Sequence, residues 1–113
     1  MKFKLFDVPL RKVNIKEWGI EGCEYAYVRE LTTAEHTELV KILYDKGNET
    51  INDAARQANA VIRFALDEDG KRLFTEDDLW DIANGSGKPA RRIIEELFAV
   101  NSLAYDAKEL EKN

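Results

Sequence analysis

The sequence of 113 residues contains one cysteine, one histidine and one methionine. A single cysteine cannot form a disulfide within the chain, and its use fits a reducing cytoplasm. The same scarcity leaves no Cys/His set for a zinc site and no spacing that indicates a nucleophile–histidine pair. We therefore expect no enzyme, no catalytic or metal-binding residue, and no cofactor.

Long apolar runs are also missing, because charged residues make up 35% of the chain and interrupt each stretch. A membrane span would need about 18 apolar residues, and the basic start Met1-Lys2-Phe3-Lys4 lacks the apolar region of a signal peptide behind it. The 17 basic and 22 acidic residues give a net charge of -5, which argues against binding to nucleic-acid phosphates. Neither a membrane nor a nucleic acid is expected as a partner.

The charge is distributed unevenly along the chain. Residues 1–16 hold five basic residues and one acidic residue, whereas residues 67–84 hold seven acidic residues and two basic residues. These segments could complement each other within one molecule or between neighbouring copies, or they could be two solvated faces.

The first third of the sequence is typical of extended chain. Val13, Ile15 and Glu17 alternate with Asn14 and Lys16 in a short stretch of period 2. Residues 19–22 hold two glycines for a turn, and residues 23–28 are rich in aromatic and β-branched side chains. Pro9 has no N–H for a sheet, so residues 3–10 are predicted as an edge strand or an arm. The pattern predicts a small antiparallel β-hairpin.

Four or five helices are predicted after the hairpin. Thr32 with Glu35, and Thr75 with Asp78, have the spacing of helix-capping pairs. The first predicted helix runs from Thr32 to Gly47-Asn48. The second begins at about Thr50 and carries an apolar stripe of Ile51, Ala55, Ala58, Val61, Ile62 and Ala65. The others run from Thr75 through Ile82, from about Pro89 to Asn101-Ser102, and from about Tyr105. The sequence thus indicates a mainly helical α+β fold and a single domain over 1–113, with a hairpin region (1–31) and a helical region (32–113).

Two short segments superficially suggest ligand sites. Asp67, Asp69, Gly70 and Glu76 have part of a calcium-loop spacing, but the first ligand position falls on Ala65, which has no side-chain oxygen. Residues 85–88 lack the spacing of a phosphate loop and follow a predicted helix instead of a strand. We interpret the first as an acidic turn and the second as a loop.

Cys23 and His36 are the residues that could anchor nucleophilic catalysis, and nothing in their separation predicts that they meet.

Three stretches together resemble the tail assembly chaperones of long-tailed, siphovirus-type bacteriophages. In the order in which this family has them, they are Tyr27–Thr32 with Glu35, Asp67–Asp78, and Leu97–Asn101 with Leu103 and Glu109–Asn113. The sequence departs from the family at Ser102, where glycine is common, and at 104–107, where an acidic capping segment is usual.

The resemblance implies a non-enzymatic assembly protein. It would bind the tape measure protein, the long helical polypeptide that sets tail length, and keep it soluble in the host cytoplasm until tube protein polymerises around it. It would be absent from the mature virion. Many copies of a small acidic domain would cover the apolar stripe of such a helix, which favours a homo-oligomer.

The family commonly makes a longer product by a minus-one ribosomal frameshift, and through that form the chain would contact the major tail tube protein. Glu111-Lys112-Asn113 could be encoded GAA AAA AAC, which contains a slippery heptamer in the correct frame. The resemblance thus implies two forms of the protein, the longer of which continues past this site in the shifted reading frame.

The contact surface for the tape measure protein is predicted on the helix from about Pro89, together with Trp80 of the short helix before it. The residues predicted to bind the partner are Trp80, Arg91, Arg92, Ile94, Leu97 and Phe98. Arg91 and Arg92 are also expected to form i,i+4 ion pairs with Glu95 and Glu96. Two alternatives stay open: the apolar members could instead fill the core, and the chain could be an acidic adaptor or inhibitor of one globular host protein.

Overall fold

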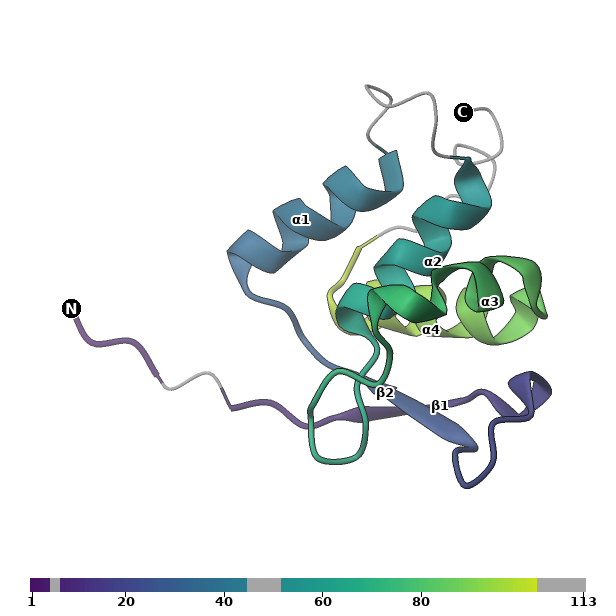
Figure 1. The fold of residues 1–113 in the computed structure, drawn as a ribbon. Helices are drawn as coiled ribbons and strands as arrows, with labels where there is room; N and C mark the ends of the chain where they lie inside the picture. Colours follow the sequence, from purple (N-terminus) through teal and green to yellow (C-terminus); the bar gives the residue numbers. More distant parts are fainter. Residues whose placement is uncertain (5–6, 45–51, 104–113) are drawn as a thin grey trace.

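The computed structural model describes residues 1–4, 7–44 and 52–103. In chain order they form the strand β1 (Arg11–Asn14), the 3₁₀ turn η1 (Lys16–Trp18), the strand β2 (Tyr25–Val28), the helices α1 (Thr33–Tyr44) and α2 (Asp53–Phe64), the 3₁₀ turn η2 (Glu76–Asp78), and the helices α3 (Leu79–Asn84) and α4 (Gly87–Val100). This arrangement confirms the predicted α+β class, with helices after an N-terminal antiparallel hairpin (Figure 1). The predicted helix ends at 47–51 and the predicted helix from Tyr105 lie outside the described residues.

The hairpin places one of its faces against helix α4. Strands β1 and β2 pair antiparallel from Arg11 opposite Val28 to Asn14 opposite Tyr25. Val13, Ala26 and Val28 are buried on the shared inner face, and α4 contacts both strands. The period-2 pattern of the sequence therefore orients the apolar side chains toward the helices.

The predicted first strand is too long at its end. The prediction extends to Glu17, whereas β1 ends at Asn14. The Asn14 side-chain oxygen accepts a hydrogen bond from the Lys16 backbone N–H at 2.9 Å, which bends the chain into η1. Gly19 then closes the turn at φ 62°. This bend moves Glu17 and Trp18 away from the sheet and toward the helices.

The described residues before β1, 1–4 and 7–10, form an arm, which is one of the two predicted outcomes. The described residues of the range 1–10 form no strand, and Phe3 is 86% exposed. Figure 1 shows the arm extending away from the body of the molecule. Its first four residues contribute no member to the buried core.

Helix α2 contacts each of the other three helices. The described members of its predicted stripe are all buried: Ala55, Ala58, Val61, Ile62 and Ala65. Asn52 caps the start of the helix by accepting a hydrogen bond from the Ala55 N–H at 2.8 Å. Small side chains on this stripe let neighbouring backbones approach closely. The apolar stripe of α4 completes the same core with Ala90, Ile93, Ile94, Leu97 and Phe98.

Both predicted capping pairs are confirmed. The Glu35 N–H donates to Thr32 Oγ1 at 3.2 Å while the Thr32 N–H donates to the Glu35 carboxylate at 3.0 Å. At the second pair, the Thr75 N–H donates to the Asp78 carboxylate at 2.8 Å, and the chain enters α3 through η2.

Within the described residues, no helix is both long enough and apolar enough to cross a membrane.

Candidate functional site

A hollow of about 380 Å³ lies between η1 and the α3–α4 corner. Its lining combines apolar and acidic side chains with the backbone of the corner. We call it the Trp18 groove and define it by Glu17, Trp18, Ile20, Phe74, Asp78, Asp81, Ile82, Gly85 and Ser86. A cavity of this size is at the lower end of the range, about 300–1,000 Å³, that binding sites occupy. The groove is therefore large enough for one or two side chains of a partner.

Trp18 is held in this groove by two contacts. Its indole N–H donates to the Ser86 carbonyl at 2.9 Å, and its ring meets Phe74 edge to face with centroids 5.6 Å apart. Gly85 keeps the space beside it, since a Cβ there would lie 2.9 Å from the Asp81 carbonyl oxygen and 3.6 Å from the Trp18 ring. The lack of a side chain at this corner thus allows α3, α4 and Trp18 to meet.

Arg92 pairs with Glu17 of the groove lining, and this contact corrects one prediction. It bonds both oxygens of Glu17 at 2.6 Å, and it also reaches the Asn14 carbonyl at 3.3 Å. The hydrogen bond from Arg92 lowers the pKa of Glu17 to about 2, and the same contact raises the pKa of Arg92. The sequence predicted an i,i+4 pair with Glu96. The fold instead brings Glu17 within reach in a two-pronged geometry, which a guanidinium favours.

The predicted contact residues divide into two groups. Trp80 is 60% exposed, and Arg91 is exposed and pairs with Glu95 at 2.9 Å as expected. The other three apolar members of the predicted surface lie in the core, with Ile94 and Leu97 fully buried and Phe98 3% exposed. Their burial is the core alternative that the sequence left open, so they could contact a partner only if the fold opened.

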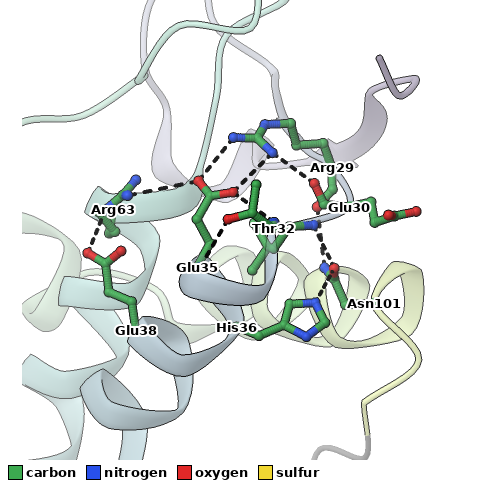
Figure 2. A network of polar contacts seen from close by, with 9 residues as sticks. Arg29, Glu30, Thr32, Glu35, His36, Glu38, Arg63 and Asn101 are labelled. Carbon is green, nitrogen blue, oxygen red and sulfur yellow. Dashed lines mark hydrogen bonds and ion pairs between the residues drawn. The ribbon is translucent and has the colours of Figure 1, made fainter. Parts of the chain in front are cut away.

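Asn101 joins the end of α4 to the junction between β2 and α1 (Figure 2). Its side-chain oxygen accepts from the Leu31 N–H at 2.7 Å, and its amide nitrogen donates to the carbonyls of Leu97 and Arg29 at 2.7 and 3.3 Å. His36 Nε2 lies 2.8 Å from the same oxygen. Since that oxygen can only accept, His36 Nε2 carries the proton.

A chain of charged residues extends from this junction to α2 (Figure 2). Arg29 binds Glu35 at 3.1 Å, Arg63 lies 3.9 Å from the same carboxylate, and Arg63 Nε donates to Glu38 at 2.8 Å. Burial alone would raise the pKa of Glu35. The hydrogen bond from the Thr32 N–H and the contact with Arg29 outweigh burial and lower it. The network fixes the start of α1 against β2 and α2.

Asp67, Cys23 and His36, which first suggested chemistry, each have a hydrogen-bond partner elsewhere. Asp67 uses its side-chain oxygen to accept from the N–H groups of Asp69 and Lys71 at 2.8 and 3.0 Å, which makes a turn. Cys23 has the Tyr25 carbonyl as its partner at 3.7 Å, while His36 has Asn101. Over residues 1–4, 7–44 and 52–103, no cluster of three or more His, Cys, Asp or Glu residues could hold a metal ion.

Sequence reasoning missed three residues that build this region: Glu17, Ser86 and Asn101. The sequence predicts a strand at Glu17, a loop at Ser86 and a helix end at Asn101. Their partners lie 75, 68 and 70 positions away along the chain. A sequence signal was available only for Asn101, which interrupts an otherwise regular apolar stripe.

No family model and no curated protein matches the chain. Among solved structures, the chain is similar to the structure of the bacteriophage HK97 tail assembly chaperone, with a TM-score of 0.55 and 16% sequence identity. The similarity covers 91% of this chain and 90% of the phage protein. Because the sequence identity is low, this similarity over most of both chains is a similarity of the backbone fold. The chain therefore shares the fold of a phage tail assembly chaperone.

Proposed function

We propose that the chain is a non-enzymatic tail assembly chaperone that binds the tape measure protein and keeps it soluble until tube protein polymerises around it. The observation that carries this proposal is the fold shared with the HK97 chaperone over 91% of the chain. The three sequence stretches that resemble the family support it independently. The host cytoplasm, where tails are assembled, is the proposed location.

The surface chemistry is compatible with such a role. A long amphipathic helix exposes an apolar stripe along its whole length and aggregates alone. A small domain with net charge -5 that covers part of the stripe would both mask it and add repulsion between coated chains. Trp80, exposed on α3, and Arg91, exposed on α4, are the proposed contacts, since aromatic residues and arginine are enriched at interfaces.

Co-expression with the tape measure protein tests the proposal. We expect the tape measure protein to remain in the soluble fraction when this chain is present and to aggregate when the chain is omitted. Trp80→Ala should weaken capture about tenfold or more, as expected of a central interface aromatic. Val40→Ala is the matched control, because Val40 is also an exposed apolar side chain but lies on α1. Equal solubility with and without the chain would contradict the function.

A charge reversal tests the second contact. Arg91→Glu should reduce capture, whereas Lys41→Glu, a reversal at an exposed position of α1, should not. Arg92 is unsuitable for this test because its reversal would also break the pair with Glu17. Equal capture by both variants would remove Arg91 from the surface but leave the function intact.

The mass of the purified complex distinguishes this function from the adaptor alternative. A chaperone that coats one long polypeptide should be present in many copies per tape measure chain. An adaptor or inhibitor should form a small complex of fixed stoichiometry with a globular protein. Native mass spectrometry of the co-purified complex separates the two.

The proposed longer form, which would contact the major tail tube protein, has a separate test. Residues 111–113 lie outside the described residues, so the test is genetic. We expect the codons to contain A AAA AAC and an overlapping frame to follow. Synonymous codons that interrupt the heptamer would rule out slippage at this site without affecting the chaperone proposal.

A further inference from the structure

We propose that copies of this chain link head to tail, with the N-terminal arm of one copy seated in the Trp18 groove of the next. The arm comprises the described residues before β1, 1–4 and 7–10, and its Phe3 is the side chain that enters the groove. This inference goes beyond the proposed function, because it concerns the chain alone and needs no tape measure protein.

The arm has the composition of a docking segment. Phe3 is 86% exposed, although burial of a phenylalanine ring is strongly favourable. Lys2 and Lys4 flank it and are exposed as well. In an extended segment, consecutive side chains alternate in direction, so one aromatic side chain can enter a hollow while the flexible lysines reach its rim.

The groove has the complementary composition. Ile20, which is 39% exposed, lines the groove together with Trp18 and Phe74. Glu17 and Asp78 are occupied by Arg92 and the Thr75 N–H, respectively. Asp81 is exposed and forms no ion pair with any residue of the described ranges. An apolar hollow with an unneutralised carboxylate suits a segment that carries an aromatic ring between two lysines.

The positions of arm and groove favour a second copy as the occupant. The arm joins β1 at Arg11, while the groove begins beyond the other end of β1, at η1. Figure 1 shows the arm and η1 at opposite ends of the hairpin, with the arm pointing away from the body. An arm at one end and a groove at the other form a heterologous contact, which builds rings or open chains instead of closed dimers.

Sedimentation velocity of the purified full chain over a concentration series tests this link. We expect species larger than a dimer to accumulate as concentration rises. Phe3→Ala should raise the concentration at half-association about 10- to 100-fold, because it removes the buried ring. A wild-type chain that stays monomeric up to about 1 mM would overturn the proposal.

The groove side has its own variants and a matched control. Ile20→Glu should weaken association as much as Phe3→Ala does, whereas Val40→Glu, the same substitution at an exposed position of α1, should leave it unchanged. Circular dichroism melts establish that each variant is folded. Equal association of the Ile20 variant and the wild type would overturn the groove as the receptor.

Mixing the two defective variants gives the sharpest test. Phe3→Ala retains an intact groove and Ile20→Glu retains an intact arm, so each alone should be monomeric at concentrations where the wild type associates. Together they should form a one-to-one dimer that grows no further, because the second arm and the second groove are both defective. Failure to form this dimer, or growth beyond it, would contradict a head-to-tail link.

Charge exchange tests the electrostatic half of the contact. Asp81→Lys should weaken association, and Lys2→Glu with Lys4→Glu should restore it in the same chain. Absence of rescue would show that the carboxylate does not face the arm. Since these measurements use no tape measure protein, their failure would leave the chaperone proposal standing, and failure of the chaperone assay would leave this link standing.

Discussion

Ser102 is the non-glycine residue with a positive φ, 56°, within the described ranges. It follows α4 and forms the turn that ends the helix. The Leu103 N–H donates to the Phe98 carbonyl at 2.8 Å, and the Ser102 N–H donates to the Ala99 carbonyl at 3.2 Å. This Schellman motif usually has glycine at the left-handed position, because a Cβ is strained there. Ser102 therefore preserves the turn at a cost in strain.

Ser102→Gly should therefore stabilise the protein. Relief of the left-handed strain exceeds the entropy that glycine loses on folding, and we expect a gain of about 0.5–1 kcal/mol in the free energy of unfolding. Urea denaturation measures it. Ser102→Ala, which retains the Cβ, is the control and should give no such gain.

Asn101 is the second residue whose role depends on its individual atoms. Asn101→Ala would leave the Leu31 N–H without its partner in a buried place and would release α4 from the β2–α1 junction. We expect a loss of about 2–3 kcal/mol in the free energy of unfolding. Asn84→Ala, at an exposed position at the end of α3, should change it by less than about 0.5 kcal/mol. A similar loss in both variants would contradict the role of the amide network.

At the scale of elements, the pair of Glu17 and Arg92 fastens η1 to α4. The pKa of Glu17 lies at about 2, below its ordinary value of 4.5. A carboxylate with a lowered pKa stabilises the folded state fully above its ordinary pKa, and the stabilisation is lost as pH falls through the folded value. The acid sensitivity of this link should therefore appear between about pH 4.5 and pH 2.

The free energy of unfolding, measured between pH 6 and pH 2, tests the pair. The wild type should lose stability more steeply in the acid range than Glu17→Gln, which has no carboxylate to protonate. Arg92→Gln should reduce the slope in the same way, because Glu17 would then titrate near its ordinary pKa. Parallel curves for all three proteins would show that the ion pair does not contribute.

At the scale of the whole molecule, the arm is separate from the core that holds the fold together. None of residues 1–4 belongs to the buried cluster. Removal of residues 1–4 should change the free energy of unfolding by less than about 0.5 kcal/mol, as for other exposed sites, and chemical denaturation measures this. A larger loss would mean that the arm packs on its own chain and would also weaken the head-to-tail link.

The fold class could be predicted from the sequence because its signals are local. The apolar stripes of α2 and α4 repeat with helical spacing, and the capping pairs at Thr32 and Thr75 each satisfy backbone groups within four residues. The same stripes could not show whether Ile94 or Leu97 faces the core or a partner. That choice depends on which other elements cover the helix.

By itself the sequence determined the hairpin, the helices and their apolar faces, because spacing along the chain sets which backbone groups and side chains are neighbours within one element. The tertiary structure alone decided that Arg92 meets Glu17, that Trp18 meets Ser86 and that Asn101 meets Leu31. Each of these pairs joins residues more than sixty positions apart. Their contacts exist only after the elements pack, since burial of the shared apolar core brings distant polar groups within hydrogen-bonding distance.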